Sequence, residues 1–429
     1  MTRGAGSRTA IRGLTSLVAF ALCAELLGLA AYYVDTGALF YIHRKEYGEL
    51  FSTPEDRLAV GEAVHPYFGF THTPRTPFSV PPGLETGAPL PATRTNNFGF
   101  ASPDDYPFHK TRDNQFVVGL FGGSVGVWFC QLGAPRLVEQ LQRHPSFRGR
   151  AIVPLCFSHE GYKQPQEALV LAYFLSVGQA FDLVINIDGF NDVALGSLNN
   201  SRGLDISMPS VQHVDPLINL VNASSLTPEK LETLAGIFRD RERLAGLART
   251  IHANRIAAVH FVLDWYYGRV RDRYVRQLGR YSNLPSNPQT NALIQLTPAV
   301  APREGEALFK DIAEEWARSS LLMHQLLSAG GVPYVHVLQP NQYFGGRRFS
   351  ASEHATALND ASPYKASVGQ GYPALVAAAQ SALRGTVRFV DATAAFDRET
   401  APMYVDNCCH YTVAGNRVLA DAIAAAVVR

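Results

Sequence analysis

Residues 115–124 read QFVVGLFGGS, and this stretch decides the fold that we predict for the chain. An apolar run at 116–121 ends in Gly122-Gly123-Ser124, and the residues that follow, 125–141, can form a helix. A short apolar run that ends at glycine is typical of a buried strand. We therefore predict a strand, a tight turn that exposes Ser124, and then a helix.

The same alternation recurs along the chain and predicts an α/β fold. Further strand-like runs lie at 151–157, 182–187, 332–338 and 387–390, and further helices are expected at 166–179, 372–383 and 412–428. Strands that alternate with helices indicate βαβ units, which build a parallel sheet.

Residues 193–330 interrupt this alternation. A polar segment at 199–225 precedes three helical stretches, near 228–253, 256–278 and 304–329. We interpret the range as a helical insert that covers the site and sets substrate choice, as long loops on a rigid scaffold often do. The predicted organisation has three parts: 1–35 as a membrane anchor or signal, 36–115 as a stalk and irregular extension, and 116–429 as the α/β domain.

The N-terminus has the pattern of a membrane anchor. Arg3, Arg8 and Arg12 precede a run at 14–34 that is apolar except for three polar residues, one of which is Glu25. A run of roughly twenty apolar residues can cross a bilayer as a helix, and the preceding arginines keep the N-terminus in the cytoplasm. We predict a single-pass protein whose C-terminal domain lies on the periplasmic side, with Glu25 tolerated in the span.

A cleaved signal peptide is the alternative interpretation of this segment. The small residues Gly28, Ala30 and Ala31 would permit cleavage, and the protein would then be secreted. Either way, the cysteines that would face an oxidising compartment, where disulfides form, are Cys130, Cys156, Cys408 and Cys409. Their pairing does not follow from the sequence, and their spacing does not match a zinc site.

The charge balance excludes one large class of partners. The chain has 38 basic and 37 acidic residues and a formal net charge of +1, whereas nucleic-acid-binding proteins carry a strong basic excess. The sequence contains neither a phosphate-binding loop of the Walker type nor a dinucleotide-binding fingerprint. We expect no nucleic-acid partner, no metal and no cofactor.

Four polar clusters fall where a parallel sheet would gather reactive groups. They lie at 123–124, 161–162, 189–192 and 406–410, the first three beyond the carboxyl ends of predicted strands. A serine hydroxyl becomes a nucleophile when a base within hydrogen-bond reach takes its proton, and histidine titrates near neutral pH. Ser124 and His410 are therefore the candidate nucleophile and general base, and the Asn191 amide is a candidate donor to an oxyanion.

Taken together and in order, these clusters resemble the four sequence blocks of the SGNH hydrolase superfamily, also called GDSL-type esterases. Gly123-Ser124-Val125 resembles the nucleophile block, and Gly161 resembles the glycine of the second block. Gly189-Phe190-Asn191-Asp192 matches the third block, Gly-x-Asn-Asp, and Asp406-Asn407-Cys408-Cys409-His410 resembles the last. The resemblance covers about 95–192 and 332–427 but not the insert.

The resemblance implies a three-layer α/β/α, flavodoxin-like fold and an ester hydrolase with a Ser-His-Asp triad. Ser124 would attack the ester, His410 would act as base, and the oxyanion would be held by the N–H groups of Ser124 and Gly161 and by Asn191. The expected partner is an ester-bearing small molecule or an acylated carbohydrate or lipid of the envelope. Two alternatives stay open: an O-acyltransferase that modifies an exported polysaccharide, and a catalytically silent envelope-binding module on the same fold.

One departure from the family pattern concerns the residue that orients His410. The family places an acid three residues before the histidine, where this chain has Asn407, and Asp406 lies four residues before it. Either the loop has one extra residue and Asp406 contacts the imidazole, or a Ser-His dyad is held by a backbone carbonyl. We favour Asp406, because an amide would not stabilise an imidazolium as a carboxylate does.

Overall fold

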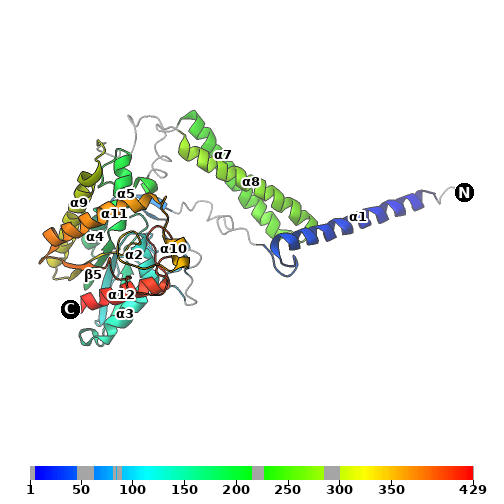
Figure 1. Ribbon diagram of the computed structural model, residues 1–429. Coiled ribbons are helices and arrows are strands. Elements are labelled where there is room, and N and C mark those ends of the chain that lie inside the picture. The colour runs from blue at the N-terminus through cyan, green and yellow to red at the C-terminus, as the bar shows by residue number, and fades with distance from the viewer. Residues whose placement is uncertain are drawn as a thin grey trace. The chain divides into compact units, whose positions relative to one another are not determined.

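The computed structural model describes residues 5–45, 62–80, 84, 89–214, 227–284 and 300–428 of the chain (Figure 1). Internal contacts divide the chain into two compact units. The first, which we call the anchor unit, comprises Met1–Ala59 and Asn222–Leu293. The second, which we call the sheet domain, comprises Val60–Val221 and Ile294–Arg429.

A five-stranded parallel sheet forms the centre of the sheet domain. Its strands, in spatial order, are β4 (Ala151–Cys156), β3 (Gln115–Gly122), β5 (Leu183–Asp188), β6 (Tyr334–Leu338) and β7 (Arg388–Asp391). Each strand coincides with one of the five apolar runs, so the prediction of an α/β fold with a parallel sheet is confirmed. Every residue of β5 and β6 is buried, because parallel strands of this kind are covered on both faces.

Two groups of helices pack around this sheet (Figure 1). One group consists of α4 (Gln166–Ser176), α5 (Phe190–Ser201), α9 (Gly305–Ser328) and α11 (Pro363–Ala378). The other consists of α2 (Ser124–Trp128), the π-helical segment η2 (Phe129–Gly133), α3 (Ala134–Arg143) and α12 (Val413–Val427). Shorter helical turns are η3 (Pro145–Phe147), α10 (Ala351–Ala357) and η5 (Ala379–Leu383). Because the strands are parallel, the loops that follow them meet at one edge of the sheet.

The described part of residues 62–114, which was predicted as an irregular extension, packs onto the sheet domain. It contains an antiparallel hairpin of β1 (Glu62–His65) and β2 (Gly69–His72). Phe68, Phe70 and Phe100 from this segment are buried in the main hydrophobic core. This segment therefore belongs to the sheet domain and, as described below, contributes to its site.

The anchor unit consists of α1 (Ala5–Thr36) and a helical hairpin of α7 (Pro228–Ala253) and α8 (Ala257–Asn283). Helix α8 packs against both α7 and α1. The range predicted as one insert, 193–330, is thus divided, since α5 and α9 pack in the sheet domain. Residues 37–45 form turns rather than the expected helical stalk, and the rest of the predicted stalk lies outside the described residues.

Two features bear on localisation. Within α1, Gly13–Thr36 is 24 residues long and apolar enough to cross a membrane or to act as a signal sequence. A disulfide between Cys130 and Cys156 joins η2 to the end of β4, with 5.9 Å between the Cα atoms. Disulfides form and persist in oxidising compartments and are rare in the cytoplasm.

Candidate active site

Ser124 is presented by a turn that only glycine can form. Strand β3 ends at Gly122, whose φ of +148° belongs to the region that favours glycine, and a Cβ there would lie 2.3 Å from the carbonyl oxygen of Ile187. A Cβ at Gly123 would lie 2.1 Å from Nδ2 of Asn191. The two glycines therefore let the chain turn sharply and bring Ser124, the first residue of α2, up to Asn191.

Ser124, His410 and Asp406 form a continuous chain of hydrogen bonds. Nε2 of His410 lies 2.8 Å from Oγ of Ser124. Nδ1 of the same ring lies 2.5 Å from Oδ2 of Asp406. The structure thus brings the predicted nucleophile and base together from opposite ends of the sheet domain.

Asp406, and not Asn407, contacts the imidazole. Its second oxygen, Oδ1, accepts hydrogen bonds from the backbone N–H groups of Cys408 (2.9 Å), Cys409 (3.0 Å) and His410 (3.2 Å). The loop folds back over the carboxylate, and this accommodates the one extra residue between acid and base. Asn407 instead uses its backbone oxygen to accept a hydrogen bond from the hydroxyl of Tyr343.

The electrostatics of this pair favour a charged imidazole. Burial alone would raise the pKa of Asp406, but the hydrogen bond from His410 and the charge on that ring hold the pKa below its usual range. Burial alone would lower the pKa of His410, but the hydrogen bond and charge of Asp406 raise it instead. Asp406 therefore stabilises the imidazolium that His410 becomes when it accepts a proton.

The predicted oxyanion donors Gly161 and Asn191 line the same cavity as the serine. Gly161 has a φ of +78°, and a Cβ there would lie 2.3 Å from the ring of His213, so the position requires glycine. Nδ2 of Asn191 donates one of its two hydrogens to the carbonyl oxygen of Tyr162 at 2.7 Å, which orients the amide and leaves the second hydrogen for a ligand. The N–H of Ser124, at a helix N-terminus, has no acceptor within the helix.

Asp192 ties two of these blocks together rather than entering the site. Its carboxylate accepts hydrogen bonds from the backbone N–H groups of Gln164 at 2.8 Å and Gly189 at 3.1 Å. The loop that carries Gly161 and the turn that carries Asn191 are therefore fixed to one buried group. This is the capping function that we expect of an aspartate at the third position of a helix.

A cavity of about 450 Å³ opens over the serine. Its walls include three of the predicted catalytic residues, two of the predicted oxyanion donors and a set of apolar and aromatic side chains. The aromatic and apolar lining residues are Leu84, Trp128, Phe190, Leu195, Tyr364 and Val405. Sequence reasoning placed the triad but did not predict these walls, because they come from five separate segments of the chain.

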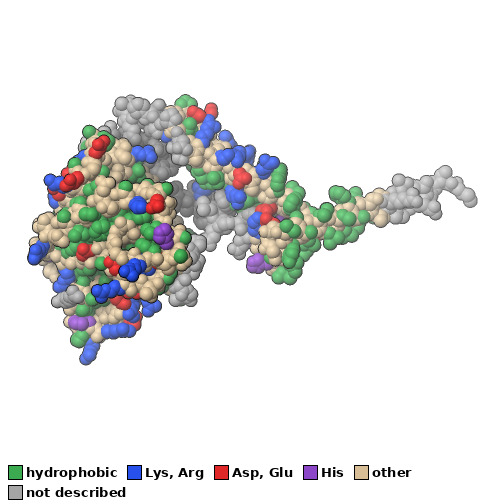
Figure 2. Space-filling view, in the orientation of Figure 1, with side chains coloured by type: hydrophobic (Ala, Val, Ile, Leu, Met, Phe, Trp, Pro, Cys, Tyr) green, Lys and Arg blue, Asp and Glu red, His purple; other side chains and the backbone are tan. Residues whose placement is uncertain are grey.

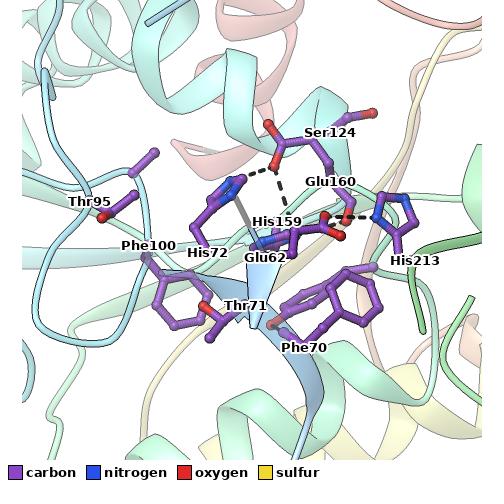
Figure 3. A network of polar contacts seen from close by, with 12 residues as sticks. Glu62, Phe70, Thr71, His72, Thr95, Phe100, Ser124, His159, Glu160 and His213 are labelled. Carbon is purple, nitrogen blue, oxygen red and sulfur yellow. Dashed lines mark hydrogen bonds and ion pairs between the residues drawn. The ribbon is translucent and has the colours of Figure 1, made fainter. Parts of the chain in front are cut away.

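Figure 3 shows a second polar cluster beside Ser124, which sequence reasoning missed. Nε2 of His72, on β2, lies 2.8 Å from Oε2 of Glu160, the residue directly before Gly161. Glu160 and His213 both line the cavity, and His213 is held by a 2.8 Å contact from its Nδ1 to Glu62. The sequence could have indicated Glu160, because it directly precedes the predicted oxyanion donor Gly161. It could not have indicated His72, which comes from the distant strand β2.

The charge state of this cluster follows from its surroundings. Burial alone would raise the pKa of Glu160, but the hydrogen bond from His72 lowers it to about 2. Burial of the neighbouring His159 lowers its pKa to about 3. At neutral pH the Glu160 carboxylate that lines the cavity is therefore ionised, and the neighbouring His159 ring, whose Nδ1 lies 3.8 Å from Oε2 of Glu160, is neutral.

The described residues contain two sets of metal-binding side chains at this site. His72, His159 and Glu160 lie close enough to share an ion, and so do Cys408, Cys409 and His410. In the second set, both ring nitrogens of His410 already contact Ser124 and Asp406, so a metal there would break the hydrogen-bonded chain. Burial raises the pKa of the Cys409 thiol, which stays protonated and does not compete with Ser124 as a nucleophile.

No family model matches the chain, and no curated protein matches its sequence. The functional argument therefore depends on the geometry of the site. That geometry consists of a serine, a histidine and an aspartate in contact, with Gly161 and Asn191 lining the same cavity as the serine.

Proposed function

We propose that the chain is a serine esterase of the SGNH type, which cleaves an ester through Ser124. The observation that carries the proposal is the unbroken contact from Ser124 through His410 to Asp406. A buried serine with this pair of partners can be deprotonated at the moment it attacks a carbonyl.

The reaction follows from the positions of these groups. Nε2 of His410 takes the proton of Ser124 while Oγ bonds to the ester carbon, and the carbonyl oxygen becomes an oxyanion held by three N–H donors. When the oxyanion collapses, the bond to the alcohol breaks and the alcohol leaves with the proton from His410. A water molecule then gives a proton to His410 while its oxygen bonds to the acyl carbon. The bond from that carbon to Oγ breaks, His410 returns the proton to Ser124, and the carboxylic acid leaves.

The order of the strands supports the flavodoxin-like assignment. Numbered along the chain, the strands β3 to β7 lie in the order 2-1-3-4-5, which is the order of flavodoxin-like sheets. Ligands of such sheets bind where the order reverses, between the first and third strands. Ser124 follows the first of these strands and Asn191 follows the third, so the proposed site lies at that position.

The lining of the cavity favours a neutral, hydroxylated substrate such as an acylated carbohydrate. Aromatic rings of Trp128, Phe190 and Tyr364 can stack on a sugar, and the carboxylate of Glu160 accepts hydrogen bonds from hydroxyl groups. Glu160 is the negative member of a pair with His72, and its carboxylate is the group of that pair that lines the cavity. An anionic substrate group would therefore be disfavoured relative to a neutral one.

An O-acyltransferase for an exported glycan is the second candidate. A cavity of about 450 Å³ is larger than a short acyl chain requires, so a sugar hydroxyl can approach the acyl-enzyme in place of water. The chemistry at Ser124 is the same in both cases, and only the acceptor differs.

The decisive experiment uses the full-length protein in lipid nanodiscs. A fluorophosphonate probe should label Ser124 in the wild type and should not label the Ser124→Ala variant. Acetyl release from an acetylated oligosaccharide, with and without an unacetylated acceptor, then separates transfer to water from transfer to a sugar. Absence of labelling in a folded wild-type protein would favour the catalytically silent module.

A further inference from the structure

The apolar helix α1 makes polar contacts with a helix that begins more than two hundred residues later. The carboxylate of Glu25 accepts hydrogen bonds from the backbone N–H groups of Ala257 at 2.8 Å and Ala258 at 3.1 Å. These are the first residues of α8, whose N–H groups have no partner within the helix and carry partial positive charge. Ile256, just before them, has an apolar side chain that cannot accept these bonds. Glu25 therefore caps α8 and is more than a tolerated polar residue.

The helices cross closely at the same point. A Cβ at Gly28 would lie 2.4 Å from the backbone nitrogen of Ala258, so α1 approaches α8 at a glycine. One turn later, Tyr32 is buried and its ring centroid lies 5.1 Å from those of Phe40 and His260. These contacts involve side chains on both helices, as expected for a permanent interface.

The turn after α1 caps the other helix of the hairpin. The guanidinium group of Arg44 donates hydrogen bonds to the carbonyl oxygens of Ile251 and His252, each at 3.1 Å, and also to that of Asn254. These carbonyls lie at the C-terminus of α7, where partial negative charge favours a cation. Glu25 of α1 and Arg44 of the turn after it thus cap both helix ends at the tip of the hairpin. Cleavage near Gly28 would remove Glu25, so these contacts indicate that α1 is retained in the mature protein.

The tip of the hairpin exposes an apolar surface next to α1. At the tip, the exposed apolar and aromatic side chains are Ile256, Val259, Phe261, Val262, Trp265 and Tyr266. A small hollow joins this surface to α1, and its lining combines the apolar and aromatic side chains of Ala31, Tyr32, Phe261 and Trp265 with Asp35, His260 and Asp264. Lys45 pairs with both aspartates. Figure 2 shows hydrophobic side chains along α1, and the apolar surface of the tip continues from them.

The charges around the tip match a lipid bilayer. Beyond Trp265 the exposed face of α8 becomes basic, and the guanidinium of Arg269 lies 5.0 Å from the Trp265 ring centroid. Arg249 and Arg255 are exposed on the other side of the tip. Aromatic rings followed by arginines are typical of the boundary between acyl chains and lipid phosphates.

We propose that the tip of the α7–α8 hairpin, residues 256–266, inserts into the outer leaflet of the membrane beside α1. Phe261, Val262 and Trp265 lie among the acyl chains, and the flanking arginines contact lipid phosphates. The bilayer is the occupant because the exposed surface is continuous with a helix apolar enough to cross it. The anchor would then hold the protein to the membrane through three helices rather than one.

The tryptophans of the chain allow a direct test. There are three; Trp128 and Trp316 are buried in the sheet domain, and Trp265 is 57% exposed. The full-length protein is placed in nanodiscs of phosphatidylcholine and phosphatidylglycerol with or without brominated acyl chains. We expect bromine to quench part of the fluorescence, and Trp265→Phe to remove most of the quenched part. Trp128→Phe is the matched control and should leave the quenched part unchanged.

Two outcomes would overturn the proposal. Equal fluorescence in both kinds of nanodisc would mean that no tryptophan reaches the acyl chains. Quenching that persists unchanged in Trp265→Phe would assign membrane contact to the sheet domain. Cysteine crosslinking through Val262→Cys serves as a further check, since efficient crosslinks between two copies would show that another protein molecule covers the tip.

Discussion

The imidazole of His72 contacts the carboxylate of Glu160 at 2.8 Å, although 88 residues separate them in the chain. Through this contact the β1–β2 hairpin, which is distant in sequence from the catalytic residues, keeps the pKa of the Glu160 carboxyl low, and this carboxylate lines the cavity. We expect the wild type to prefer neutral acetylated sugars to acetylated uronates. We measure this preference as kcat/KM for the neutral sugar divided by kcat/KM for the uronate. Glu160→Gln should lower that ratio by about tenfold, since removing a repulsion of about 1.4 kcal/mol corresponds to that factor.

The matched control for this prediction is Glu314→Gln. Glu314 is a carboxylate on α9 whose contacts are ion pairs on the surface with Lys310 and Arg318. Its substitution should leave the ratio of the two kcat/KM values unchanged. An unchanged ratio in Glu160→Gln as well would remove the argument for a neutral substrate while leaving the serine mechanism untouched.

Adjacent substitutions test which residue orients His410. Asp406→Asn keeps the shape of the side chain but loses the charge, so kcat should fall by about 10⁴, the loss expected when a triad carboxylate becomes an amide. Asn407→Ala should reduce kcat by less than about tenfold, because the contact of Asn407 at this site comes from its backbone oxygen. Steady-state kinetics on an aryl acetate measure both values. Equal losses in the two variants would contradict the proposed triad.

The pH dependence follows from the raised pKa of His410. The base must be neutral to accept the serine proton, so kcat/KM should fall as pH drops through a pKa above the ordinary value of about 6.5. Asp406→Asn removes the charge that stabilises the imidazolium, so the acid limb should move to lower pH. A pH–rate profile of each protein provides the measurement, and an acid limb that moves upward in the variant would contradict the assignment.

A pair of glycines tests the oxyanion hole. Gly161→Ala would place a methyl group against the His213 ring at a positive φ, which displaces the N–H donor. Losing one such donor typically lowers kcat by about 10²–10³. Gly178→Ala is the control, since Gly178 has a φ of +93° but open space around its Cβ position. The Gly178→Ala variant has the backbone strain of about 1–2 kcal/mol but no steric clash at the new methyl group. Its Tm should therefore fall while its kcat stays near that of the wild type.

The sequence predicted the elements whose determinants are local. The apolar runs at 116–121 and 182–187 mark strands because burial on both faces leaves no polar positions, and a helix was predicted at 228–253, where α7 lies. The order of the polar blocks then placed Ser124 and His410 at one edge of the sheet. Local pattern and strand order were sufficient for this much.

Long-range contacts were not predictable in the same way. No spacing connects His72 with Glu160, and no pattern tells that Glu25 caps a helix beginning at Ala257. The choice between Asp406 and Asn407 also required coordinates, because it depends on how the backbone folds over the carboxylate. In each case the partner is selected by three-dimensional packing, which the sequence of one chain does not display.

The Cys130–Cys156 disulfide joins the segment after the nucleophile helix to the strand that leads into the Gly161 loop. Cytoplasmic thiols remain reduced, so if the sheet domain is exported, as we propose, a newly synthesised chain gains this covalent link only after translocation. On the proposed function, maturation of the catalytic geometry is therefore coupled to export. An enzyme that gains its full catalytic geometry only after export would not hydrolyse esters inside the cell.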